Sequence, residues 1–286
     1  MKKFILFAVA LALCTTLFGC SKEKEPDITT LQLYVEEEDI RDLIVENEKR
    51  TDLSDDEKEY FNCLKKSLVK MADGYTYTLK SDTLGYVVDT LVLEYHSDDS
   101  YKVCGPRTYQ YSTFTFKNEL GDNDSTTEVT MLYDEDTMYM RLANNEGETK
   151  EIAKISDYMS EADYGLEELG DTGISSTLIP AEAQEIFKTL KKSTENGNTV
   201  FTFNRTVNTQ AGDSTISGSS TTKVTFNAKG LLLSVETQTS MDLTYEEFFD
   251  DEHQNVTSTY SFSDLGVHID ITAPADADEY KPWNKQ

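Results

Sequence analysis

Few residues in this sequence could carry acid–base or nucleophilic chemistry. Three histidines occur among the 286 residues, none with a zinc-ligating partner at close spacing: His96, His253 and His268. The pattern S-x-x-K of serine acyl-transfer enzymes begins at Ser21, Ser67 and Ser220, but its S-D-N and K-T-G partners are missing. The sequence also has no G-x-S-x-G elbow and no phosphate-binding G-x-x-x-x-G-K. We therefore expect no catalytic residues.

Acidic residues are numerous enough to raise the question of a calcium site. Asp122 and Asp124 open a turn that looks like the start of an EF-hand loop. That loop needs a glycine at position six and a glutamate at position twelve, and both are missing here. A second acidic cluster, 246–252, lies between two expected strands. We expect solvated acidic loops, with no metal and no cofactor.

The first twenty residues are typical of an export signal. Lys2 and Lys3 precede the unbroken apolar run 4–13, and the chain turns polar after Cys20. Gly19 followed by Cys20 resembles the lipobox of bacterial lipoprotein signal peptides. In that family the cysteine thiol is diacylglycerylated, and cleavage then makes the cysteine residue one. The resemblance implies a signal peptide over 1–19 and a lipid anchor at Cys20; the alternative is a plain secretory signal.

The charge of the chain limits its partners. The sequence has 53 acidic and 26 basic residues, a formal net charge of −27. Too few cations cluster to bind nucleic acid, and the charge alone would repel the protein from an anionic membrane. Loss of residues 1–19 removes two lysines and no acid, so the mature net charge is −29. The lipid on Cys20 must therefore hold the protein, with residues 20–35 as a flexible tether.

Two cysteines remain once Cys14 is cleaved off and Cys20 is acylated. An even pair in an exported domain favours one disulfide, between Cys63 and Cys104. It would close a loop of about forty residues and stabilise the fold by roughly 3–4 kcal/mol. The alternative is two buried free thiols that behave as small hydrophobic groups.

The body of the chain, 36–286, alternates helix patterns with strand patterns. Helices are expected near 36–50, 54–72 and 180–194. Ser54 and Glu57 have the spacing of a capping box. Each of the last two helices leads through a glycine turn into strands that alternate threonine with aromatic residues, close enough together to pair antiparallel. The sequence thus predicts an α+β fold, a large curved antiparallel sheet of two helix-plus-meander halves with helices covering its concave face.

Two C-terminal segments carry a recognisable pattern. One is the turn Asn227–Leu232, which reads N-x-x-G-x-L, and the other is Ser258–Pro274, which reads as a final strand ending in proline. They are similar to the last strands of bacterial lipoproteins with the LolA/LppX-like fold. That resemblance implies a half-open β-barrel with helices in its mouth, where some members carry lipids or lipoprotein acyl chains. It implies no catalytic residue.

We therefore expect a non-enzymatic bacterial lipoprotein on the outer face of the cell membrane, anchored by diacylglyceryl-Cys20. An apolar or lipid-like ligand, or a partner protein, would bind on the concave face of the sheet. Six aromatic residues are candidates for that face: Tyr75, Tyr77, Tyr109, Tyr111, Phe114 and Phe116. They cannot all point one way, because Tyr111 and Phe114 differ in parity. The alternative is a solid-core surface interaction or structural module without a small-molecule ligand.

Replacing Cys20 with alanine should abolish fatty-acid labelling and release the protein from membranes, because it removes the thiol at the lipobox position. Metabolic labelling and membrane fractionation measure both effects. Cys14→Ala is the matched control and should change neither, since that cysteine lies in the cleaved segment. Labelling that persists in Cys20→Ala would show that the lipid is attached elsewhere.

Overall fold

The fold comes from a computed structural model. It describes residues 27–31, 33, 35–118, 125–134, 136–154, 177–178, 187–211, 214–245 and 251–283. The signal segment, Cys20 and most of the acidic cluster at 246–252 lie outside these ranges. None of the described helices is long and apolar enough to cross a membrane.

Two α-helices precede the strands in the described chain, and three short 3-10 helices lie before, between and after these elements. The helices are α2 (Val35–Glu48), α3 (Asp55–Met71), η1 (Ile28–Thr30), η2 (Phe187–Thr189) and η3 (Ala277–Glu279). The strands are β1 (Tyr75–Val87), β2 (Thr90–Cys104), β3 (Arg107–Asn118), β4 (Ser125–Asp134), β5 (Thr137–Asn144), β6 (Gly147–Lys154), β7 (Lys191–Glu195), β8 (Asn198–Ala211), β9 (Ser214–Phe226), β10 (Leu232–Tyr245), β11 (Glu252–Ser263) and β12 (Lys281–Pro282).

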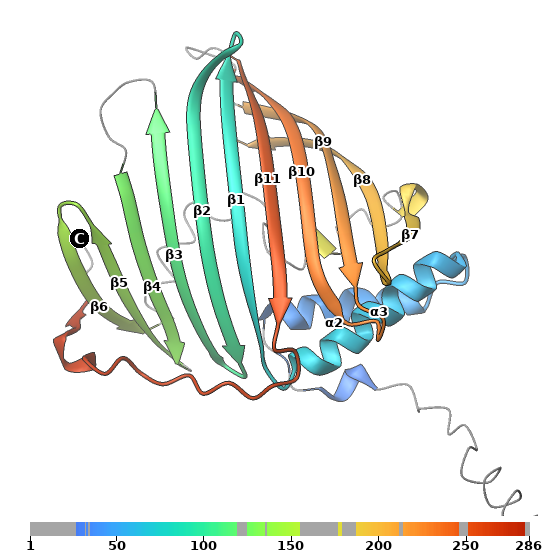
Figure 1. Cartoon of the computed structure of the whole chain (residues 1–286), viewed down its shortest axis with the longest axis horizontal. Coiled ribbons are helices and arrows are strands. Elements are labelled where there is room, and N and C mark those ends of the chain that lie inside the picture. The colour runs from blue at the N-terminus through green and yellow to red at the C-terminus, as the bar shows by residue number, and fades with distance from the viewer. Residues whose placement is uncertain are drawn as a thin grey trace, which may run out of the picture.

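All twelve described strands form one open sheet, in the order β12-β6-β5-β4-β3-β2-β1-β11-β10-β9-β8-β7 (Figure 1). Strands β1 to β6 make one meander and β7 to β11 another. The antiparallel pairing of β1 with β11 joins the two. Among the described strands, only the short contact of β12 with β6 is parallel. The expected α+β class and the two antiparallel meanders are therefore confirmed.

Helix α3 forms where the sequence predicts it. The Ser54 Oγ accepts a hydrogen bond from the Glu57 amide, and the Glu57 carboxylate accepts one from the Ser54 amide, at 3.2 and 2.6 Å. The apolar side chains on one face of the helix are buried: Tyr60, Phe61, Leu64, Leu68 and Met71. Ser67 fixes the helix to the sheet, because its hydroxyl accepts from the Leu232 amide at 2.8 Å.

Tyr60 stands at the centre of the aromatic core between α3 and the sheet. The centroid of its ring lies 5.2–6.1 Å from the centroids of five phenylalanine rings, and most of these contacts are edge to face. The five are Phe61, Phe187, Phe201, Phe203 and Phe226. Its hydroxyl donates to the Leu178 carbonyl at 2.8 Å, which gives the buried group a partner. Burial raises the pKa of Tyr60. This part of the core is solid.

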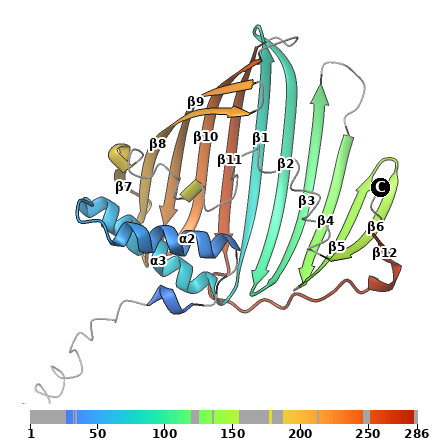
Figure 2. The ribbon, with the colours of Figure 1, turned by 180° about the vertical axis from the view of Figure 1, so that it is seen from behind.

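Both α-helices lie across one end of one face of the sheet, which we call the inner face (Figure 2). The sheet curls toward this face, which makes it the concave one. The helices cover the ends of β8 to β11 and the start of β1, but no described helix covers β2 to β6. Both α-helices with described bounds precede β1; ahead of the second meander the structure describes only 177–178, which are α-helical, and 187–190.

The helix expected over 180–194 is wrong where the structure describes it. Residues 187–189 are the 3-10 helix η2, and 191–195 form the edge strand β7. Asn196 and Gly197 have φ values of +51° and +80°, the two-residue turn of a β-hairpin that joins β7 to β8. The glycine turn expected after this helix is therefore the turn of a hairpin. The periodicity ahead of it reflects Phe187 and Leu190, which pack against the core.

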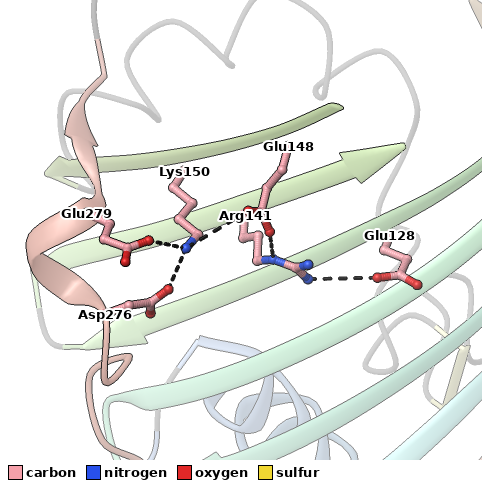
Figure 3. Close-up of polar contacts among 6 residues, drawn as sticks. All are labelled: Glu128, Arg141, Glu148, Lys150, Asp276 and Glu279. Atoms are coloured by element: carbon pink, nitrogen blue, oxygen red, sulfur yellow. Dashed lines mark hydrogen bonds and ion pairs between the residues drawn. The ribbon is translucent and has the colours of Figure 1, made fainter. Parts of the chain in front are cut away.

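The C-terminal segment is also not the strand that the sequence predicts. Strand β11 ends at Ser263, and residues 267–274 leave the sheet without strand pairing. The segment then runs along the end of the first meander and adds β12 to the edge of β6 (Figure 1). Lys150 on β6 holds it by ion pairs with Asp276 and Glu279, both at 2.6 Å (Figure 3). These carboxylates raise the pKa of Lys150.

Gly197→Ala should lower the free energy of unfolding by about 1 kcal/mol, because a side chain disfavours positive φ. A Cβ at this position would touch nothing within 4 Å, so the backbone alone sets the cost. Urea unfolding measures the change. Ser193→Ala, on the exposed edge strand, is the control and should stay within about 0.5 kcal/mol. An unchanged or more stable Gly197→Ala would contradict the hairpin.

Candidate functional site

The register of the sheet decides which face each predicted aromatic residue occupies. Tyr77 on β1 pairs with Tyr101 on β2, and Tyr101 pairs with Gln110 on β3. Even-numbered residues of β3 therefore share the face of Tyr77. Phe114 and Phe116 lie on that inner face together with Tyr75 and Tyr77. The remaining two candidates, Tyr109 and Tyr111, lie on the outer face.

Tyr75 and Tyr77 belong to the core and do not line an open surface. They are 2% and 9% exposed. Tyr77 stacks on Tyr101 with centroids 4.2 Å apart and on Phe262 at 5.5 Å. Tyr109, on the outer face, lies 5.4 Å below the ammonium of Lys102. Of the six candidates, the structure leaves two for an inner-face ligand.

Those two, Phe114 and Phe116, lie where no described helix covers the sheet. Phe116 is 38% exposed and Phe114 is half-buried. Tyr95 on β2 pairs with Phe116 in register, and its ring lies 6.4 Å from that of Phe114. Val256 on β11 and Met241 on β10 lie at similar heights of the same face and are also half-buried. The far part of the inner face therefore carries several partly covered apolar side chains, with the polar residues Thr83, Thr239 and Gln254 between them.

A row of hydroxyl side chains crosses the inner face between this apolar part and the aromatic core. Five neighbouring strands each contribute one residue, and each residue is paired in register with the next. In the order β9, β10, β11, β1 and β2 they are Thr222, Thr237, Ser258, Ser81 and Ser97. Phe203 and Phe114 stand at its two ends. The Ser81 and Ser258 hydroxyls lie 3.0 Å apart. Hydroxyls at inward-facing positions of five neighbouring strands are unlike an apolar core.

A carboxylic acid lies at the β2 end of this hydroxyl row. Asp99 is half-buried and pairs in register with Ser112, whose side chain is 5% exposed. The Ser97 hydroxyl donates to the Asp99 carboxylate at 3.2 Å. Burial raises the pKa of Asp99, although these hydroxyls partly oppose the change. The carboxylate has no cationic partner among the described residues, a feature that often marks a functional site.

An arginine lies at the opposite end, one register position from the hydroxyl row. Arg205 on β8 pairs with Ser220 on β9, which pairs with Thr239 on β10. The Thr239 hydroxyl donates to Ser220 at 2.9 Å. The Nε atom of Arg205 is buried, and so is the hydroxyl of Thr237, and neither has a hydrogen-bond partner in the part of the chain that the structure describes. The inner face thus carries a cation at one end and a carboxyl group at the other.

The predicted disulfide is not formed, because both thiols are free. Cys63 is buried on α3 next to the β9–β10 turn, and burial raises its pKa. Cys104, at the end of β2, lies 3.3 Å from the His268 ring and faces the Asp73 carbonyl. The C-terminal segment supplies this histidine from 164 residues away. No local pattern could have shown the contact.

The other two histidines pair with carboxylates on the outer face. His96 contacts Asp82, and His253 lies 2.8 Å from Asp242. In the described part of the chain, no three His, Cys, Asp or Glu side chains gather to hold a metal ion.

A separate hollow of about 770 Å³ lies away from the inner face, between α3 and the β9–β10 turn. Charged side chains dominate its lining. Its two acids are neutralised, Glu48 by Lys65 at 2.8 Å and Glu59 by Lys192 at 2.5 Å. It is a solvated, charged depression on the surface and has no apolar wall suited to a lipid-like ligand.

The sequence matches no known protein family, and it matches no curated protein. Among solved structures, there is a weak match to a Bacteroides fragilis protein provisionally described as an outer membrane protein. The match covers 66% of this chain and 98% of that chain, at 8% sequence identity and a TM-score of 0.15. The likeness to LolA/LppX-like lipoproteins, seen in the strand pattern, stays a prediction.

Asp99→Asn should raise the free energy of unfolding at pH 7. The folded state raises the pKa of Asp99 above the ordinary 3.8, so the ionised carboxyl destabilises the fold at neutral pH. This penalty disappears as the pH falls below the ordinary value, so the gain should vanish near about pH 3. Urea titrations at both pH values measure it.

Asp98→Asn is the matched control, because Asp98 is the next residue but lies on the outer face. It pairs with Lys80 at 3.0 Å in solvent, and its loss should cost less than about 0.5 kcal/mol. A lower stability of Asp99→Asn at pH 7 would contradict the burial argument.

Proposed function

We propose that this protein is a non-enzymatic, lipid-anchored protein on the outer side of a bacterial membrane that binds an amphipathic, lipid-like ligand on the inner face of its sheet. The hydroxyl row carries this proposal. A protein that needed only a solid core would bury apolar side chains at these five inward positions, as it does under α3. Hydroxyls there suit the polar part of a bound molecule.

The apolar part of the ligand would lie over the half-exposed side chains beyond the hydroxyl row. Tyr95, Phe114 and Phe116 lie on one side of this region, and Met241 and Val256 on the other. Methionine and aromatic side chains adapt to flexible acyl chains better than a rigid polar wall does. A polar strip beside a half-covered apolar surface matches a molecule that has both a head group and a tail.

The proposed location rests on the lipobox-like Gly19-Cys20. An acyl anchor at Cys20 would keep the domain beside a membrane, which is also a source of lipid-like molecules. The resemblance of the turn Asn227–Leu232 and of the sequence Ser258–Pro274 to LolA/LppX-like lipoproteins points to the same kind of ligand, although only the first part of the second segment is a strand. The second candidate is a solid-core interaction module, which the tightly filled aromatic cluster around Tyr60 favours.

Phe114→Ser should weaken binding of a fluorescent phospholipid analogue about tenfold or more, because it removes an aromatic contact on the inner face. Tyr111→Ser is the matched control: it removes a half-buried aromatic residue of the same strand on the outer face, and affinity should change less than twofold. Fluorescence titration measures both.

Mass spectrometry of lipids extracted after gentle purification completes the test, and a co-purified lipid is expected. A protein that is empty, binds no analogue and shows no difference between the two variants would favour the solid-core module.

A further inference from the structure

We propose that Arg205, with Thr237 and Ser220, binds an oxyanion group of the ligand, a carboxylate or a phosphate, at the β8 end of the inner face. This inference rests on the proposed binding of a lipid-like ligand and specifies the charge of its head group. It also specifies the direction in which the ligand lies along the hydroxyl row.

Arg205 differs from every other arginine of the chain. The sequence has five arginines, and the other four each pair with a carboxylate: Arg41 with Asp42, Arg50 with Asp52, Arg107 with Asp134 and Arg141 with Glu148. Arg205 has no carboxylate partner among the described residues. In a chain with 53 acidic residues, an inward-facing guanidinium without a carboxylate among the described residues is unexpected. Guanidinium groups suit carboxylates and phosphates because their donors form a planar fork.

The surroundings of Arg205 add further hydrogen-bond donors. Its own Nε–H and the hydroxyl of Thr237 are buried, and no described residue forms a hydrogen bond with either. A buried donor without a partner is costly, so such groups are rare unless something binds them. Ser220 accepts from Thr239 at 2.9 Å, which leaves the Ser220 proton available to donate. Arg205 and Thr237 lie two strands apart, about 10 Å across the sheet, a gap that a long side chain and an oxyanion together can span.

The carboxyl group at the opposite end of the hydroxyl row gives a reason for the anion to bind at β8. The carboxyl group of Asp99 lies there, half-buried and with no cationic partner among the described residues. An anionic head group at Asp99 would meet a like charge, whereas at Arg205 it meets a cation. The charges therefore favour a ligand whose anionic head lies over β8 to β10, with its apolar part directed across the sheet.

Three single-chain probes that differ only in the head group test this proposal: hexadecanoate, hexadecyl phosphate and the uncharged hexadecanol. Each displaces the neutral fluorophore N-phenyl-1-naphthylamine from the mature chain. The wild type should bind at least one of the two anions about tenfold or more tightly than hexadecanol, the gain expected from a charge-assisted hydrogen bond. Which anion is preferred separates a carboxylate site from a phosphate site.

Arg205→Gln should abolish this preference and leave the affinity for hexadecanol unchanged, and Thr237→Val should reduce the preference several-fold. Arg141→Gln is the control, since it removes an arginine of the outer face, and the preference should persist. Equal affinity of the wild type for all three probes, or a preference that survives Arg205→Gln, would overturn the oxyanion site but leave lipid binding intact. Failure of all three probes to displace the fluorophore would instead overturn the proposed function, and this inference with it.

Discussion

The antiparallel pairing of β1 with β11 is the constraint on which the rest of the structure depends. It joins two meanders that are distant in sequence into one sheet, and it runs from Thr76 with Ser263 to Tyr86 with His253. The same register places Leu79 beside Tyr260 in the core and Ser81 beside Ser258 in the hydroxyl row. A slip of one residue would turn both rows to the outer face. Core and candidate site therefore share one register.

The inner face divides its length between a packed core and the proposed binding region. Near α3, the aromatic residues around Tyr60 fill the space and bury the apolar surface that stabilises the fold. Farther along the same strands, hydroxyls, a carboxyl group and a guanidinium replace them, and each is costly to bury without a partner. Such groups persist where binding compensates for their cost, and the solid core at the other end supplies the stability that they reduce.

Local patterns in the sequence predict local structure well here and long-range structure poorly. The capping box at Ser54 and Glu57 identified α3, and the threonine–aromatic alternation identified most strands, because both signals lie within a few residues. The helix expected over 180–194 is wrong over its described residues, 187–194, because Asn196-Gly197 forms a hairpin turn and 191–195 form a strand. Asp98 and Asp99 look alike in the sequence, and pairing alone places one outside and the other inside. Contacts between distant segments likewise create three other features: the hydroxyl row, the surroundings of Arg205, and the contact of Cys104 with His268.

Both edges of the described sheet carry features that disfavour pairing with a further strand. An open sheet exposes unpaired backbone groups at each edge, which invite another strand. On one edge, β7 is short and carries Lys191, Lys192 and Glu195, all exposed. On the other, β12 covers part of β6, and the ion pairs of Lys150 hold it in place (Figure 3). Charge at one edge and a covering strand at the other thus let the sheet remain curved and open. A ligand would then reach the hydroxyl row over the open inner face, without displacing a strand.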